Sequence, residues 1–220
     1  MGDALVAVLI TRVEDDELTL YCSKWVEKEV IPEAQARGIE IIDLKREKAV
    51  RKEVEGRIKS LNPELLLFNG HGDPSTICGH QGQPLIEDGK NSAVLNGKIV
   101  HSLTCDSASI LGKNSVNSYG TKTFIGYTEK FIGLTDDMSV TAPLKDEIAR
   151  PFMESAMAVS KALVKGNTAG EAYRKSQDMY RYWISYYRAK SESKDASDIL
   201  LYLGADMEVQ VLLGDANASV

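Results

Sequence analysis

Short apolar runs alternate with helical patterns along the first half of the chain. The run Ala4 to Ile10 has the length and the β-branched residues of a strand that is buried on both faces. Between Glu17 and Arg37, apolar residues recur four positions apart, which predicts a helix. Further strands are predicted at Ile39–Leu44, Leu65–Phe68, Ile99–Leu103 and Thr123–Tyr127, with another helix at Val50–Leu61. Residues 70–97 are polar and rich in glycine, and we interpret them as a loop.

The second half of the chain is mainly helical in pattern. Apolar residues at helical spacing run from Phe152 to Leu163, and Thr168 followed by Glu171 predicts a capping box that opens a helix through Tyr187. A short helix is predicted at Asp195–Leu203, and a sixth strand at Met207, Val209, Val211, Leu212 and Leu213. Alternating strands and helices predict an α/β fold with a mostly parallel sheet, whose functional sites lie at the carboxyl ends of strands.

Composition narrows the class of protein. The 220 residues, of which 43% are hydrophobic, are enough for one core, so we predict a single domain over residues 1–220. A formal charge of −6 disfavours a nucleic-acid partner. The three cysteines are too few for a disulfide framework and fit a reducing compartment. No secretory pattern opens the chain and Ala4–Ile10 is too short to cross a bilayer, so we expect a cytoplasmic protein without a membrane partner.

Two predicted strands end in residues that can carry chemistry. The third strand leads into His71, and the fourth leads into Cys105. If these strands are neighbours, an imidazole and a thiol face each other at one edge of the sheet. An adjacent histidine can take the proton of a cysteine thiol and so activate it as a nucleophile.

The residues beside this pair suit an oxyanion. Gly72 has no Cβ, so its backbone amide can approach a substrate closely, and the Cys105 amide is a natural second donor. A helix that begins after Cys105 would also place its positive end near the sulfur and lower the pKa of the thiol.

The two strand ends resemble those of the caspase-like cysteine peptidases, which include caspases, gingipains, separases and CHAT domains. One apolar strand ends in His71 and Gly72, and the other ends in Cys105 with small residues after it. The stretch from Pro151 to Ala172 and the closing Leu213, Gly214 and Asp215 are similar to gingipain and CHAT-type members. The resemblance implies a caspase-like three-layer sandwich with a mainly parallel six-stranded sheet.

The resemblance also implies an activity. His71 and Cys105 would form the catalytic dyad of a cysteine endopeptidase that works through a thioester acyl-enzyme, with the Gly72 and Cys105 amides as oxyanion donors and no cofactor or metal. Asp106 departs from the pattern expected of this family, because its charge would oppose formation of the Cys105 thiolate. The alternative is an inactive caspase-like scaffold that docks a protein partner through the aromatic and basic stretch between Tyr173 and Arg188.

Four carboxylates are candidates for a substrate-binding role. The resemblance implies a P1 pocket lined by the loop after the histidine, the region beside the cysteine and the segments after the next strands, which here supply Asp73, Asp106, Asp136 and Asp137. An acidic lining would favour a basic P1 residue. Solvated loop carboxylates are the commoner explanation for such residues. The expected partners are thus a peptide or protein substrate and a regulatory protein.

The remaining histidines and cysteines have plainer explanations. Cys78 and His80 could form a second dyad, or bind zinc with His71, but no fourth ligand stands at a suitable spacing. His101 lies inside an apolar run and Cys22 on a helix face, so both are predicted to be core residues. A phosphate loop is disfavoured, because no glycine motif of that kind follows the first strand.

Overall fold

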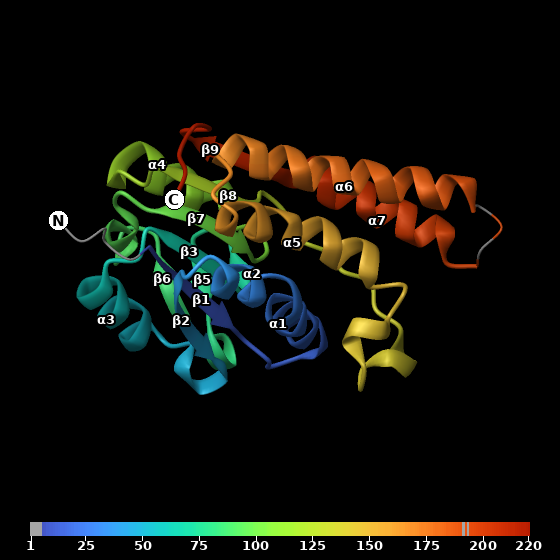
Figure 1. Cartoon of the computed structure of the whole chain (residues 1–220), viewed down its shortest axis with the longest axis horizontal. Coiled ribbons are helices and arrows are strands. Elements are labelled where there is room, and N and C mark those ends of the chain that lie inside the picture. Colours follow the sequence, from blue (N-terminus) through green and yellow to red (C-terminus); the bar gives the residue numbers. More distant parts are fainter. Residues whose placement is uncertain (1–5, 191, 193) are drawn as a thin grey trace.

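A central sheet organises the molecule in the computed structural model, which describes residues 6–190, 192 and 194–220 (Figure 1). Its six strands lie in the order β2-β1-β3-β7-β8-β9. They are β1 (Ala7–Arg12), β2 (Glu40–Lys45), β3 (Leu65–Asn69), β7 (Ile99–Leu103), β8 (Thr123–Tyr127) and β9 (Gln210–Gly214). All neighbouring pairs are parallel except β8 and β9. The predicted strand at Ala4–Ile10 is β1, although Ala4 and Leu5 lie outside the described residues.

Helices cover both faces of this sheet and make three layers. One face carries α1 (Glu17–Glu29), α2 (Ile31–Ala36), α5 (Arg150–Val164), α6 (Ala169–Ala189) and α7 (Ala196–Val209). The other carries α3 (Arg51–Leu61), a π-helical turn (Ala108–Gly112) and α4 (Lys113–Tyr119). Strand side chains alternate between the two cores: Val8 and Ile10 point to the first, Ala7 and Leu9 to the second. This confirms the predicted α/β sandwich with a mainly parallel six-stranded sheet.

A second, small sheet lies in the stretch that the sequence predicts as loop. It consists of β4 (Gly72–Asp73), β5 (Thr76–Cys78) and β6 (Pro84–Glu87), which pair in antiparallel fashion. Strands of two to four residues are too short to show an alternating pattern, which is why the sequence does not reveal them. The buried Ile77, Leu85 and Ile86 anchor this sheet to the second core.

Two predicted boundaries are wrong. The helix expected at Glu17–Arg37 is two helices, because Pro32 stands in the first turn of α2 and cannot continue the hydrogen bonding of α1. Met207 and Val209 belong to α7 rather than to the last strand. The buried residues of α7 keep a spacing of three or four positions to its last turn, so packing extends the helix beyond its predicted end. The capping box of Thr168 and Glu171 is present, as predicted.

Candidate functional site

The parallel register of β3 and β7 places the two candidate catalytic residues at equivalent positions. Asn69 pairs with Leu103, and His71 and Cys105 each follow two residues later. The chains stay close beyond the last pair, since the Gly70 amide lies 3.5 Å from the Leu103 carbonyl oxygen. The structure thus brings the predicted histidine and cysteine to neighbouring strand ends.

Gly72 packs directly on the turn that carries the cysteine. A Cβ atom at Gly72 would lie 2.7 Å from the Cys105 carbonyl oxygen and 2.9 Å from Oγ1 of Thr104, so no larger residue fits without displacement.

The His71 carbonyl accepts a hydrogen bond of 2.9 Å from the Cys78 amide. Because antiparallel pairing alternates, the Gly72 amide faces away from β5. Within residues 6–190, 192 and 194–220, the Cys105 amide has no hydrogen-bond acceptor. Neither amide is therefore engaged by a backbone acceptor within the described residues.

Buried hydroxyl groups shape the turn at Cys105. Thr104 Oγ1 donates to Ser107 Oγ at 2.8 Å, Ser107 Oγ lies 3.1 Å from Ser102 Oγ, and Ser102 Oγ lies 2.7 Å from Thr104 Oγ1. The helical segment predicted after Cys105 begins at Ala108 as a π-helical turn. Such turns are frequent at functional sites. The hydroxyl triangle fixes the backbone on both sides of the thiol.

Asp16 is a member of this site that the sequence analysis missed. It is the N-cap of α1, where its Oδ1 accepts a hydrogen bond of 2.9 Å from the Thr19 amide. Its Oδ2 lies 2.8 Å from Nε2 of His71. Burial would raise the pKa of Asp16, but the hydrogen bonds from Thr19 and the contact with His71 outweigh it and lower the pKa. Asp16 therefore presents a carboxylate oxygen to Nε2 of His71.

A signal for Asp16 is present in the sequence. Asp16 follows the first apolar run, as His71 and Cys105 follow the third and fourth. The carboxyl ends of parallel strands meet at one edge, and β1 lies beside β3 in the sheet. What the sequence does not give is this strand order, without which Asp16 looks like an ordinary helix cap.

The Cys105 thiol is half-buried and lies against the chain that follows β8. Its Sγ lies 3.9 Å from the Phe131 carbonyl oxygen. Burial raises the pKa of the Cys105 thiol, and the carboxylate of Asp106 adds to this effect. The Asp106 carboxylate therefore disfavours the Cys105 thiolate, as expected from the sequence. Asp106 also has φ of +59°, a left-handed conformation that costs a non-glycine residue energy.

The four candidate substrate-binding carboxylates do not share one environment. Asp73 accepts hydrogen bonds from the amide and hydroxyl of Ser75, and Asp136 accepts from the Met138 amide and the Ser139 hydroxyl. Both therefore stabilise their own turns, and Asp137 is exposed beside Asp136. Asp106 instead lines a hollow of about 440 Å³ together with Glu129, Lys130, Ile132, Ala205 and Val209. Cys105 precedes Asp106 in the chain but does not itself line this hollow.

His80, His101 and Cys22 each lie in a different environment from the pair, whereas Cys78 contacts His71 through its backbone amide. His80 contacts Asp15, with Nδ1 to Oδ1 at 2.9 Å. His101 is buried with Nδ1 2.7 Å from Ser160 Oγ, and burial lowers its pKa to about 3. Cys22 is buried in α1, where burial raises the pKa of its thiol to about 12. Among the described residues, no three His, Cys, Asp or Glu side chains are grouped so that they could hold a metal ion.

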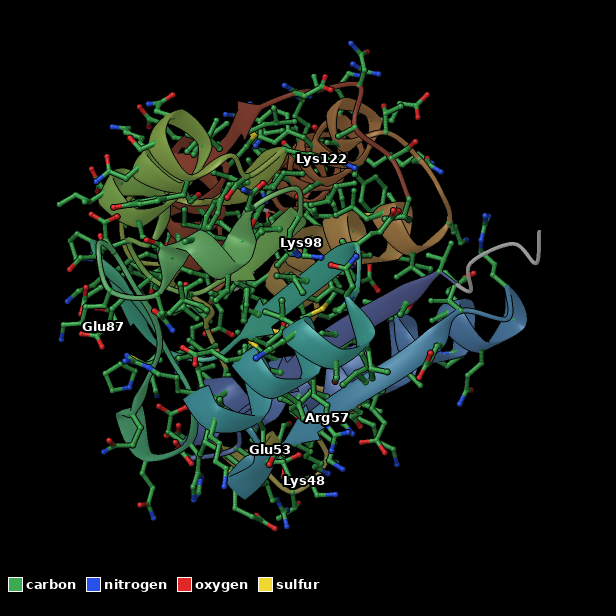
Figure 2. The ribbon with its side chains drawn as sticks, turned by 90° about the vertical axis from the view of Figure 1, so that its left-hand side faces the viewer. Lys48, Glu53, Arg57, Glu87, Lys98 and Lys122 are labelled. Atoms are coloured by element: carbon green, nitrogen blue, oxygen red, sulfur yellow. The ribbon has the colours of Figure 1, made fainter. Side chains whose placement is uncertain are left out.

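Two larger hollows lie away from the strand ends. One, of about 580 Å³, runs between α5 and α6 over Ala158, Met179 and Trp183. The other, of about 600 Å³, lies between β2 and α3, where Figure 2 labels Lys48, Glu53 and Arg57. Lys98 and Lys122, also labelled, directly precede β7 and β8 and so mark the opposite edge of the sheet from Cys105.

Comparison with known proteins gives a likeness of fold. No protein-family model and no curated protein matches the sequence. A solved structure of gingipain R, described as an Arg-specific cysteine proteinase, superposes with a TM-score of 0.53 at 11% identity. The match covers 97% of this chain and 47% of that one, so the chain spans about half the length of gingipain R. The fold is caspase-like. In the described part of the chain, the helices are too short or too polar to span a bilayer.

Proposed function

We propose that the chain is a cysteine peptidase whose catalytic pair is His71 and Cys105. The observation that carries the proposal is the register of β3 and β7, which sets both residues two positions beyond a paired Asn69 and Leu103. The likeness of fold to a cysteine proteinase supports it. Asp16 adds a carboxylate to the far side of the imidazole, as in other histidine-assisted nucleophile sites.

Each group has one role in the proposed reaction. Nδ1 of His71 takes the proton of the Cys105 thiol, and the sulfur attacks the carbonyl carbon of the peptide bond. The amides of Gly72 and Cys105 donate to the oxyanion. His71 then gives its proton to the leaving nitrogen as the C–N bond breaks, which leaves a thioester. Water, deprotonated by His71, hydrolyses the thioester and restores the thiol.

A basic side chain is the proposed P1 residue. Asp106, the neighbour of Cys105 in the chain, and Glu129 line the hollow of about 440 Å³, and these two acidic residues outnumber its one basic residue, Lys130. Asp73, Asp136 and Asp137 are assigned a weaker, long-range contribution, because two of them are engaged in turns and the third is exposed. A library of fluorogenic peptides that differ at P1 tests this preference; equal rates for Arg and Leu substrates would contradict it.

Thiol labelling tests the catalytic pair. Iodoacetamide modification from pH 5 to 9, with peptide mapping, should show Cys105 reacting faster than Cys22 and Cys78, and His71→Ala should remove that advantage. Peptide hydrolysis should vanish in Cys105→Ala and fall by about 10²–10⁴-fold in His71→Ala. If Cys105 reacts no faster than Cys22, and no peptide is cleaved, the proposal fails.

The second candidate function is a scaffold without catalysis. The raised pKa of the Cys105 thiol favours it, because a neutral thiol is a poor nucleophile. In α6, Tyr180 and Trp183 are buried whereas Tyr182 is 56% exposed, which leaves an aromatic group for a protein partner. Under this alternative, Cys105→Ala should leave partner binding unchanged, and Tyr182→Ser should weaken it.

A further inference from the structure

The segment 129–132 is fastened beside the candidate nucleophile at three points. The Glu129 carbonyl accepts a hydrogen bond of 3.0 Å from the Asp106 amide. The Phe131 carbonyl oxygen lies 3.9 Å from Sγ of Cys105. The Ile132 amide donates to Oδ1 of Asp206 at 2.8 Å. Two of the three contacts are made by Cys105 or its neighbour, and the third comes from α7.

Asp206 is an unusual residue to find at the third point. Its side chain is fully buried, and its Oδ2 has no hydrogen-bond partner among the described residues. Burying a carboxylate costs free energy unless its oxygens are satisfied, so a purely structural position would favour an apolar residue. The contact that uses this carboxyl group is the one to the backbone of the segment 129–132.

The protonation of Asp206 defines how it can act. Burial raises the pKa of this carboxyl group well above its usual range, and the hydrogen bond from Ile132 only partly opposes this. The raised pKa favours the uncharged acid, which repels a nearby thiolate less than a carboxylate does. Asp206 acts as a hydrogen-bond acceptor.

The end of α7 is itself held firmly, so that Asp206 has a fixed position. Nε2 of Gln177 in α6 donates to the Met207 carbonyl at 3.0 Å. The Thr128 amide donates to the Val209 carbonyl at 2.9 Å. Asp206 thus connects a rigid helix end to the segment that lies on Cys105.

We propose that Asp206 is a positioning residue of the site, which holds the Phe131–Ile132 backbone against the Cys105 thiol. The proposal rests on the peptidase function but concerns a residue outside the catalytic pair. In this arrangement the segment 129–132 forms a wall of the site, limits access to the sulfur and presents an ordered backbone to the substrate.

The experiment compares Asp206→Ala with Asp206→Asn, which keeps an acceptor oxygen without a charge. In Asp206→Ala, iodoacetamide labelling of Cys105 should rise about fivefold, the effect of losing one neutral hydrogen bond, while peptide hydrolysis should fall. In Asp206→Asn both should stay near wild type. A merely structural role would not move these two readouts in opposite directions.

Cys22 supplies the internal control, because this buried thiol is labelled only when the fold opens. If Asp206→Ala also exposes Cys22, Ile132→Pro removes the same hydrogen bond from the other side and should raise Cys105 labelling by itself. Wild-type labelling of Cys105 in Asp206→Ala, or an equal change in Asp206→Asn, would overturn the proposal. Labelling does not depend on turnover, so a lack of peptidase activity would refute only the proposed function.

Discussion

At the scale of single residues, Asp16 has two separable contacts. Asp16→Asn should keep the helix cap, because asparagine caps well, but remove the charge that faces His71. We expect kcat/KM for peptide hydrolysis to fall roughly tenfold or more, with little change in Tm. Thr19→Val is the comparison: it removes the hydroxyl that bonds the Asp16 amide and Oδ1 but keeps the carboxylate at His71, so Tm should fall and activity should fall less than in Asp16→Asn. Full activity in Asp16→Asn would show that His71 works without this carboxylate.

Gly72 is where backbones approach too closely for any side chain. In Gly72→Ala the new methyl group meets the Cys105 carbonyl at 2.7 Å, so the turn must move. We expect a loss of about 1–3 kcal/mol in the free energy of unfolding, measured by urea denaturation, and a large drop in peptide hydrolysis. Gly56→Ala is the control, since nothing lies within 4 Å of its Cβ position in α3 and alanine favours helix. Equal stability of the two variants would contradict the packing of Gly72.

At the scale of elements, the small sheet β4-β5-β6 begins beside His71, and at that same end the turn between β5 and β6 is held by Asp15. His80 lies 2.9 Å from Oδ1 of Asp15, and the Gln81 amide donates to the other oxygen of that carboxylate. His80→Ala should loosen this sheet, which hydrogen exchange would show as faster amide exchange over residues 71–87.

Gln81→Asn is the matched control for that change. It keeps the backbone amide that Asp15 binds, and asparagine tolerates the left-handed conformation of this residue, φ +53°. Exchange should therefore stay at the wild-type rate. If His80→Ala leaves exchange over residues 71–87 unchanged, the contact with Asp15 does not hold the small sheet in place.

The elements also show what the sequence can and cannot predict. The runs at 65–68, 99–103 and 123–127 predict strands within a residue of their true ends, because strands buried on both faces are mostly apolar. The candidate pair, His71 and Cys105, could be predicted because each residue comes just after the end of one of these strands. The small sheet and Asp16 cannot be predicted in this way, since the sheet consists of strands of two to four residues and the place of Asp16 depends on β1 lying beside β3. Contacts made between elements, such as that of Asp206 with Ile132, leave no local pattern.

At the scale of the whole molecule, the strand order explains the site. Strands β1, β3 and β7 are adjacent in the sheet. One residue of the site follows the carboxyl end of each: Asp16 after β1, His71 after β3 and Cys105 after β7. Helices α5, α6 and α7 pack on the first core, on one face of this sheet (Figure 1). A rigid sheet thus sets the spacing of the three side chains, whereas the access to Cys105 depends on the less regular segment after β8.

Acid stability tests how the edge of the sheet beside this site is held. Glu14, whose side chain is only 2% exposed, accepts a hydrogen bond of 2.7 Å from Ser23 in α1 and pairs with Lys45 and Arg46 at the end of β2. Burial would raise the pKa of Glu14, but these partners outweigh it and lower the pKa from 4.5 to about 2. A carboxyl group with a lowered pKa stabilises the fold above its unfolded pKa. That contribution is lost as the pH falls from about 4.5 towards 2.

Glu14→Gln should therefore lower the free energy of unfolding at pH 7 by on the order of 2 kcal/mol and have little effect at pH 2. Urea denaturation at a series of pH values measures this difference. Glu53→Gln is the control, because Glu53 forms only an exposed pair with Arg57 at 3.5 Å on α3 (Figure 2). Its stability should follow the wild-type curve at every pH. If the free energy of unfolding of Glu14→Gln followed the same pH curve as the wild type, the junction of β1, β2 and α1 would not depend on the charge of Glu14. Packing alone would then hold that edge.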